Sequence, residues 1–276
     1  MVMPMIKSRD NLGFIILDGI AEKMELVPNT HGTYSYIFDG DKYFYKRCKD
    51  VGQIYNELVG YELAKDFGID AIEYDLASYN GFIGVTSKDY MKKDYVCLED
   101  MLKSFYGTDK DKCTYVDVCE MLFTKYYELS SELMKDLLRL IMFDVIIGNS
   151  DRHDRNIIID TSNLRLAPIS DNELLLNSNA LEKGYYSFSI DGEKDKTSYK
   201  LLNYLNNDDL ELFKEKVKLI EREHILEIIN RIEKKIGAPM VDFMKEKLLN
   251  DSAIHYMQLH KLLYRDNIFK LLFRKK

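Results

Sequence analysis

The chain has 276 residues, and its 46% hydrophobic and 31% charged residues are typical of one large globular domain or two lobes. This composition excludes a disordered protein, and no apolar run is long enough to predict a membrane-spanning helix. A net charge of −7 argues against direct nucleic acid binding, which needs a basic surface. The four cysteines lack Cys-x-x-Cys spacing and the N-terminus lacks a secretory signal, so we expect a cytoplasmic protein.

The first 92 residues are predicted to be mostly β-strand, with one helix. Short runs rich in β-branched and aromatic residues predict the strands, and Asp or Asn next to Gly predicts the turns between them. The expected strands are 13–17, 34–38, 42–46, 71–77 and 82–86. Apolar residues at helical spacing predict a helix over 53–67, and Gly68 is a typical residue to end it.

Residues 93–276 are predicted to be mainly helical. Helices are expected over 97–105, 115–127 and 131–147, two short strands over 157–160 and 165–169, and four further helices between about 197 and 273, the clearest over 223–236. This order predicts an α+β protein with the bilobal layout of kinases. We expect a strand-rich N-terminal lobe over 1–92, a helical C-terminal lobe over 93–276 that carries the catalytic loop, and a nucleotide cleft between them.

The most informative motif follows the longest apolar helix. Asp151 is followed five residues later by Asn156, and Asp171 lies fifteen residues beyond Asn156. Phosphoryl transfer needs one carboxylate to orient the accepting hydroxyl, and an amide and a second carboxylate to hold Mg²⁺. The two short strands after Asn156 form a natural hairpin, which would bring Asn156 and Asp171 together at its open end. The motif therefore predicts a kinase with Asp151 as base and the other two as metal ligands.

His153 lies inside this motif, among the candidate catalytic residues. We expect it to brace the catalytic loop by hydrogen bonds rather than to act as the general base. A zinc site is not expected, because no second His or Cys lies nearby in the sequence.

Lys46, in a predicted strand, is the candidate for gripping the nucleotide phosphates. A kinase positions such a lysine with a glutamate from a neighbouring helix. The helix that follows offers Glu57 and Glu62, of which we favour Glu57 and keep Glu62 as the alternative. Gly32 and Thr33 precede another predicted strand and are expected to cover the phosphates through backbone N–H groups.

Four segments of the chain resemble the HipA-like Ser/Thr kinases, bacterial enzymes related in architecture to protein and phosphatidylinositol kinases. NELVGYELAKDFGID is similar to the family's helix that opens with Asn-Glu and ends at Gly, and CLEDMLKSFYG to its segment after the hinge. FDVIIGNSDRHDRNIIID matches its Asp-x-His-x-x-Asn catalytic loop, and LAPISD resembles its metal-binding turn. The segments occur in the family's order and cover roughly residues 30–175.

The resemblance implies a protein-kinase-like fold, ATP and Mg²⁺ as cofactors, and the roles given above for the catalytic loop and the metal ligands. It also implies that Lys46 is the ATP lysine and that Ser87, Lys88 and Asp89 form the hinge whose backbone meets adenine. Fewer residues precede Lys46 than in the full-length family, so we expect a compact form.

We therefore expect ATP- and Mg²⁺-dependent transfer to a Ser or Thr hydroxyl of a protein substrate. The resemblance also suggests a toxin of a toxin–antitoxin system, with the existence of an antitoxin-type partner left open, and autophosphorylation, for which Thr30, Thr33 and Ser35 are candidates. One alternative is a lipid or small-molecule kinase, since phosphatidylinositol kinases share an Asp-Arg-His-x-x-Asn loop. Another is a non-catalytic binding module, against which the intact base and metal ligands argue.

Overall fold

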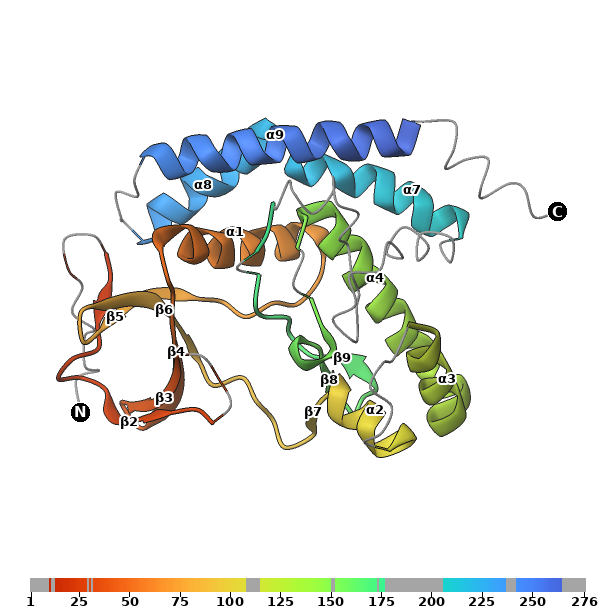
Figure 1. Cartoon of the computed structure of the whole chain (residues 1–276), viewed down its shortest axis with the longest axis horizontal. Coiled ribbons are helices and arrows are strands. Elements are labelled where there is room, and N and C mark those ends of the chain that lie inside the picture. The colour runs from red at the N-terminus through yellow and green to blue at the C-terminus, as the bar shows by residue number, and fades with distance from the viewer. Residues whose placement is uncertain are drawn as a thin grey trace, which may run out of the picture.

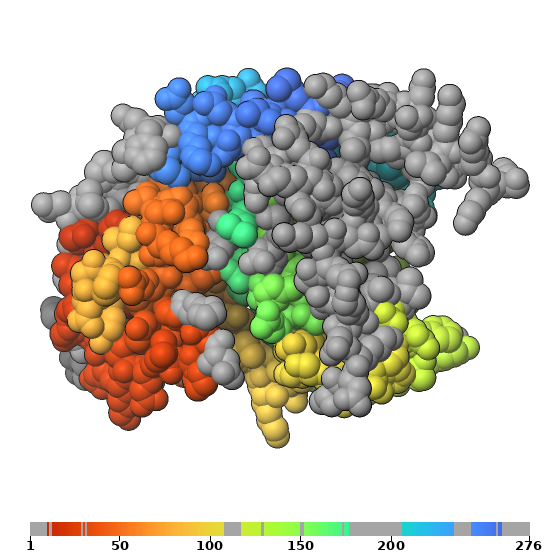
Figure 2. Space-filling model, viewed as in Figure 1, coloured from red at the N-terminus to blue at the C-terminus, as the bar shows by residue number. Residues whose placement is uncertain are grey.

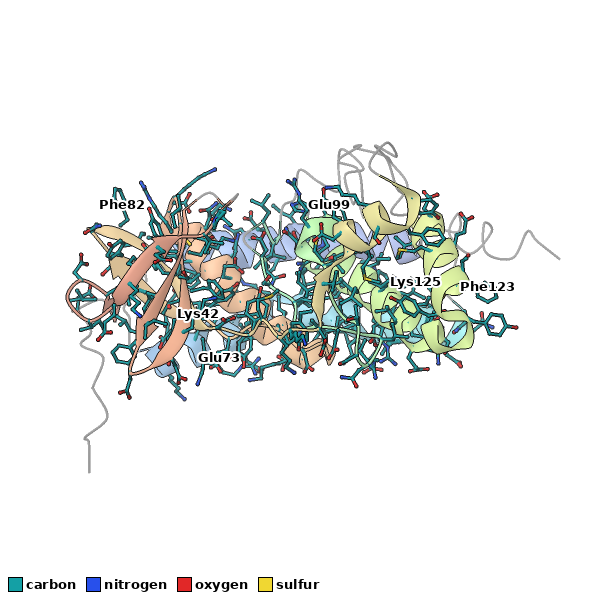
Figure 3. All side chains as sticks on the ribbon, turned by 90° about the horizontal axis from the view of Figure 1, so that it is seen from below. Lys42, Glu73, Phe82, Glu99, Phe123 and Lys125 are labelled. Carbon is teal, nitrogen blue, oxygen red and sulfur yellow. The ribbon has the colours of Figure 1, made fainter. Side chains whose placement is uncertain are left out.

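The computed structural model describes residues 10, 13–28, 30, 32–107, 115–149, 152–172, 174–176, 206–236 and 242–264. A strand-rich part built from N-terminal residues lies beside a larger, mainly helical part, and the last helices run along one side of both (Figures 1 and 2). The molecule is elongated, so that Phe82 in the strand-rich part and Phe123 in the helical part lie near opposite ends (Figure 3). The predicted α+β fold with a strand-rich part followed by a helical part is confirmed.

The strand-rich part is a curled six-stranded sheet (Figure 1). Its strands are β1 (Ile15–Ile16), β2 (Glu22–Leu26), β3 (Thr33–Phe38), β4 (Asp41–Arg47), β5 (Asp75–Tyr79) and β6 (Phe82–Lys88), in the order β1-β5-β6-β4-β3-β2. The β3–β4 hairpin turns at Asp39-Gly40 and the β5–β6 hairpin at Asn80-Gly81, and all four of these residues have positive φ. Both turns predicted from the sequence are confirmed, because two-residue hairpin turns favour positive φ.

Two strand predictions need correction. The sequence does not predict β2, because its mostly charged residues lie exposed at the edge of the sheet and carry no apolar pattern. The predicted strand over 71–77 is wrong in its first half. Ala71 forms an isolated parallel bridge with Ile169 instead, and β5 begins only at Asp75.

The second part packs helices around a small antiparallel sheet of β7 (Tyr95–Cys97), β8 (Ile158–Asp160) and β9 (Arg165–Leu166). The helices are α2 (Leu98–Tyr106), α3 (Tyr115–Tyr126), α4 (Ser131–Ile147), α7 (Asn207–Lys216), α8 (Arg222–Ile236) and α9 (Asp242–Tyr264), with 3₁₀ segments η1 (Tyr127–Ser130), η2 (Asp154–Asn156) and η4 (Val217–Ile220). β9 is shorter than predicted because the chain beyond it leaves the hairpin to pair with Ala71.

Beyond residue 205 the described residues contain three α-helices and one 3₁₀ segment, where the sequence predicts four helices. Residues 197–205, 237–241 and 265–273, which belong to that prediction, lie outside the described part of the chain. None of the helices in the described part is both long and apolar enough to span a bilayer.

Helix α1 (Val51–Phe67) connects the two parts. It contacts β6 on one side and α4, α8 and α9 on others (Figure 1). Its side chains Ile54, Val59 and Leu63 are fully buried in a hydrophobic core that extends into α4 and α8. The helix ends at Gly68, whose φ of 92° confirms the predicted stop. Because α1 is packed from several sides, it holds in place any side chain that it directs toward the cleft.

A buried histidine joins α9 to the end of α4. His255 is fully buried, and its Nε2 lies 3.1 Å from the carbonyl oxygen of Val145. Burial lowers the pKa of His255 to about 4, because the charged imidazolium would lose its hydration. The folded protein therefore holds His255 neutral, whereas the unfolded chain takes up a proton at about pH 6.5.

We predict that acid weakens the fold through His255. Between about pH 6.5 and pH 4 the unfolded chain binds a proton that the folded protein does not, so the free energy of unfolding falls as the pH falls through this window. The limit of the effect is about 3 kcal/mol. Urea unfolding at pH 7 and pH 5 measures it, and His255→Gln should flatten the decline. An equal decline in both proteins would show that other groups cause it.

Candidate active site

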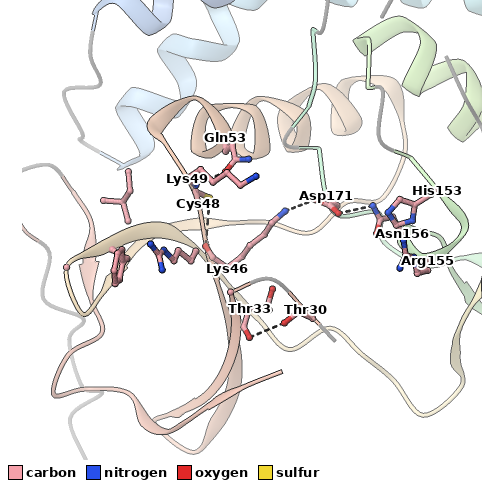
Figure 4. A pocket seen from close by; sticks show the side chains of 15 residues that line it. Thr30, Thr33, Lys46, Cys48, Lys49, Gln53, His153, Arg155, Asn156 and Asp171 are labelled. Atoms are coloured by element: carbon pink, nitrogen blue, oxygen red, sulfur yellow. Dashed lines mark hydrogen bonds and ion pairs between the residues drawn. The ribbon is translucent and has the colours of Figure 1, made fainter. Parts of the chain in front are cut away.

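Lys46 of β4 is held between two carboxylates. Its Nζ lies 2.8 Å from Oε1 of Glu57 on α1. It also lies 2.5 Å from Oδ1 of Asp171 (Figure 4). Glu57 is fully buried. Glu62, the alternative partner, lies instead near the side chains of Arg231 and Lys65, at 3.4 and 3.5 Å. Of the two glutamates that the sequence offers, the structure therefore pairs Glu57 with Lys46.

The pKa values of the two carboxyl groups that share Lys46 are shifted in opposite directions. For Glu57, burial outweighs the attraction of Lys46 and the pKa is raised. For Asp171, burial also acts to raise the pKa, but the charge and hydrogen bond of Lys46, with smaller contributions from Arg152 and His153, lower it below its ordinary value. Asp171 is therefore ionised at neutral pH, as a metal-binding carboxylate must be.

Asp171 lies in a turn that several contacts fix. Its φ of 63° is in the left-handed region, which Asp tolerates better than most residues. The Nδ2 of Asn156 donates to its Oδ2 at 2.8 Å. Before it, the backbone of Ile169 bonds to Asp70 and Ile72 at 2.8 Å, and after it the amide of Asn172 donates to Glu57 at 2.9 Å. The predicted meeting of Asn156 and Asp171 is thus present, and α1 and the segment after it hold the turn.

Gly60 lets α1 approach this turn closely. A Cβ atom at Gly60 would lie 2.5 Å from the Cβ of Asn172, much closer than real Cβ atoms come to other heavy atoms. Glu57 lies one helical turn before Gly60, so the same close approach brings the carboxylate to the amide of Asn172. The close approach therefore explains why this position holds a glycine, since any side chain here would clash with Asn172.

Sequence reasoning missed a buried ion pair beneath the turn. The Nε of Arg152 lies 3.1 Å from Oδ2 of Asp144, and both side chains are buried. Arg152 also donates to the carbonyl oxygen of Ser170 at 2.5 Å and to Oδ1 of Asn172 at 2.8 Å. The sequence does contain a signal, because Asp144 interrupts the apolar run LIMFDVII and a charge there needs a buried partner.

Asp144 and Arg152 each favour the charged form of the other, against the effect of burial. Burial acts to lower the pKa of Arg152, but Asp144 raises it above its ordinary value, so the guanidinium stays charged. Burial raises the pKa of Asp144, while Arg152 and Asn149 oppose that rise. Arg152 therefore links the end of α4 to the turn that carries Asp171.

The structure describes residue 149 and residues 152–156 of the predicted catalytic loop, but not residues 150 and 151. Asp151, the predicted base, lies outside the described residues, between Asn149 and Arg152. His153 lines the same cavity as Asn156 and Asp171 (Figure 4). Its Nδ1 is buried and has no hydrogen-bond partner among the described residues. The expected bracing by hydrogen bonds is therefore not made through Nδ1 within the described residues, although the backbone carbonyl oxygen of His153 accepts from the backbone N–H of Asn156 at 2.9 Å.

Two neighbouring cavities meet at Lys46, Asn156 and Asp171. The larger has a volume of about 1250 Å³, and Gly32 and Thr33 also line it. The smaller has a volume of about 290 Å³ and a mainly apolar lining. That lining includes Val27, Phe44, Tyr74, Tyr90, Met91 and Ile158. An apolar pocket beside a charged cleft has the shape and chemistry that suit a base joined to a polyphosphate.

The three predicted hinge residues lie in three different surroundings. Ser87 lines the smaller cavity. The side chain of Lys88 points to Asp41, with Nζ 2.6 Å from Oδ2. The backbone N–H of Asp89 donates to the carbonyl oxygen of Lys42 at 2.9 Å, so this amide is already used within the sheet. Of the three, only Ser87 lines either of these two cavities.

The oxygen donors at this site fit a magnesium ion. Asn156 and Asp171 supply an amide and an ionised carboxylate side by side, which suits a hard cation that keeps several of its waters. Within the described residues no group of three or more His, Cys, Asp or Glu side chains is arranged as a metal site. A cation here would therefore also depend on waters and on substrate phosphates.

Comparison with known proteins identifies the family of the chain. Residues 15–239 match the HipA-like C-terminal domain. The chain belongs to this HipA-like family. The "proinflammatory kinase CtkA" of Helicobacter pylori has a similar structure, with a TM-score of 0.64 and 20% identity over 94% of this chain and 99% of that one. HipA of Shewanella oneidensis MR-1, solved with HipB and operator DNA, gives 0.53 and 15% over 88% and 67%.

At these identities the two structures show the fold alone, which is kinase-like. A search among curated proteins found no match. The HipA-like family and the kinase-like fold together support a HipA-type kinase.

We predict that the buried ion pair is needed for stability. Arg152→Gln leaves Asp144 buried and uncompensated, and should lower the free energy of unfolding by about 3–5 kcal/mol. Arg165→Gln is the matched control, because Arg165 is half-exposed in its ion pair with Asp136 and should lose about 1 kcal/mol or less. Urea unfolding of the three proteins makes the comparison. Similar losses in both variants would contradict a special role for the buried pair.

Proposed function

We propose that this protein is an ATP- and Mg²⁺-dependent Ser/Thr protein kinase of the HipA-like type. The observation that carries the proposal is the contact of Lys46 with both Glu57 and Asp171, with Asn156 on the second oxygen of Asp171. A kinase needs this combination of a phosphate-gripping lysine and adjacent metal ligands. We also propose that residues 1–92 and 93–276 are its two lobes.

In this proposal the adenine occupies the smaller cavity beside Ser87, and the triphosphate extends toward Lys46 and the loop at Gly32 and Thr33. Asn156 and Asp171 would hold Mg²⁺, which when bound neutralises charge on the phosphates. The substrate hydroxyl oxygen forms a bond to the γ-phosphorus as the bond to the β–γ bridging oxygen breaks. ADP leaves with that electron pair, and the hydroxyl proton passes to Asp151.

The partners that we propose follow from the family. HipA of Shewanella oneidensis is solved with HipB and operator DNA, and we propose that this chain likewise binds an antitoxin-type protein. We propose that the chain itself does not bind nucleic acid, because its net charge is −7. As a toxin acting on protein substrates it would work in the cytoplasm.

We predict that Asp171→Ala and Asp151→Asn separate metal binding from transfer. Asp171→Ala should abolish Mg²⁺-dependent ATP binding, because it removes the ionised metal ligand. Asp151→Asn should leave binding largely intact and remove transfer, because in this proposal Asp151 contacts only the accepting hydroxyl. Calorimetry with ATP and Mg²⁺, together with phosphate incorporation, measures both. An equal loss of ATP affinity in the two variants would show that these roles are misassigned.

We predict that Lys46→Met lowers turnover by at least ~10²-fold, because the transferring phosphoryl group loses a positioned positive charge. Lys125→Met is the control, because Lys125 is exposed on α3 at the opposite end of the molecule from the strand-rich part (Figure 3). Release of ADP measures turnover. Near-normal turnover by Lys46→Met would show that another cation performs this role.

We predict autophosphorylation at Thr30, Thr33 or Ser35, just before β3 or at its start. Thr30 and Thr33 are better placed than Ser35, because each lines both cavities, whereas Ser35 lines neither. A phosphate there adds nearly two negative charges beside the triphosphate site and should repel ATP. Mass spectrometry of protein made with ATP, compared with Asp151→Asn protein, tests this. Active enzyme without phosphate on any of the three would refute the prediction.

A further inference from the structure

The larger cavity is lined by several cationic side chains besides Lys46. Four cationic side chains, Lys46, Arg47, Lys49 and Arg155, line it, and Asp171 is the one carboxylate among its described lining residues. Lys46 and Asp171 already compensate each other. None of the other three cations forms an ion pair with a described residue. In a chain of net charge −7, this concentration of positive charge without an ion-pair partner in the described part of the chain marks a binding surface.

These cations do not all lie in the same region of the larger cavity. Arg155 lines both cavities, whereas Arg47 and Lys49 line only the larger one. Figure 4 shows Lys49 and Arg155 on opposite sides of the contact between Lys46 and Asp171. Arg47 and Lys49 therefore lie outside the lining of the apolar pocket that suits the base.

Arg47 is held in place without losing its charge. Its guanidinium carbon lies 3.4 Å from the centre of the Phe82 ring, at the start of β6. Stacking on an aromatic ring fixes the plane of a guanidinium and leaves its N–H groups available to carboxylates. A charged group that is oriented before the ligand arrives loses less conformational entropy on binding.

We propose that Arg47, Lys49 and Arg155 bind an acidic segment of the protein substrate, whose Asp or Glu side chains flank the hydroxyl that is phosphorylated. This inference rests on the proposed function, because it names the substrate class for that cleft. Like charges around one cavity repel each other, and an anionic segment that enters it removes this repulsion. The phosphates of the nucleotide are served by Lys46 and the metal ligands, so the other cations remain for the substrate.

The shape and the overall charge of the protein favour a polypeptide over other polyanions. The cations line a hollow of about 1250 Å³ rather than a flat or convex face. An extended peptide can enter such a hollow, whereas a nucleic acid duplex or a membrane needs a broad basic surface. The net charge of −7 opposes the approach of large polyanions, while a short acidic segment meets mainly the local positive field.

Peptide binding without ATP tests the inference independently of catalysis. The probe is a fluorescent peptide with Ala at the acceptor position and Asp and Glu on both sides, compared with the same peptide carrying Asn and Gln. Anisotropy at low salt should show about tenfold tighter binding of the acidic peptide, because each exposed charge pair adds a modest amount. High salt should remove the difference.

Charge reversal locates the effect. The double variant Arg47→Glu and Lys49→Glu should abolish the preference for the acidic peptide. If this reversal perturbs folding, the double variant Arg47→Gln and Lys49→Gln replaces it and should reduce the preference. Lys125→Glu is the matched control, because Lys125 is exposed on α3 at the far end of the molecule (Figure 3) and should keep the preference. Circular dichroism checks that each variant is folded.

Equal binding of the two peptides, or a preference that survives both double variants, would overturn the inference. Tighter binding of a single-stranded oligonucleotide or of anionic lipid vesicles, lost in the same variants, would also overturn it and assign the hollow to that polyanion. The corresponding serine peptides with Mg²⁺ and ATP give the second readout. Intact preference without phosphate incorporation or ADP release would refute the kinase activity and leave the acidic docking site standing.

Discussion

The site depends on one cation shared by two carboxylates. Lys46 joins Glu57 of α1 to Asp171, which lies 125 residues away from the lysine along the chain. Without the lysine, two acidic groups would face each other in a largely buried place, and their repulsion would oppose the approach of α1 to the turn. With it, Asp171 stays ionised for a metal while the buried Glu57 orients the lysine.

The geometry of this contact is supported by buried polar groups as well as by the apolar core. Arg152 bonds to Asp144 at the end of α4 and to the backbone and side chain of the turn, so the helical part determines where Asp171 lies. Gly60 allows α1 to come equally close from the other side. Such a network gives a single arrangement because each buried donor that lost its acceptor would be left unsatisfied.

Charge is distributed unevenly over the molecule, in a way that suits the binding of phosphates and acidic side chains. The chain as a whole is acidic, yet the charged side chains among the described residues that line its larger cavity are mainly cationic. Phosphates and acidic side chains are both attracted to such a cavity, and low-dielectric walls strengthen the local field. A positive interior in an acidic protein restricts polyanion binding to ligands that can enter the cleft, which favours selectivity over general adhesion.

The sequence by itself determined the fold class, both hairpin turns, the end of α1 and the meeting of Asn156 with Asp171. These follow from local rules: turn residues with positive φ, helical periodicity, and the spacing of polar residues along a hairpin. Tertiary structure alone decided that Glu57 rather than Glu62 meets Lys46, since both lie on the same helix. It also decided the burial of Arg152 against Asp144, the bridge that replaces the start of a predicted strand, and the gathering of cations around one cavity. These depend on contacts between distant segments, which spacing along the chain does not encode.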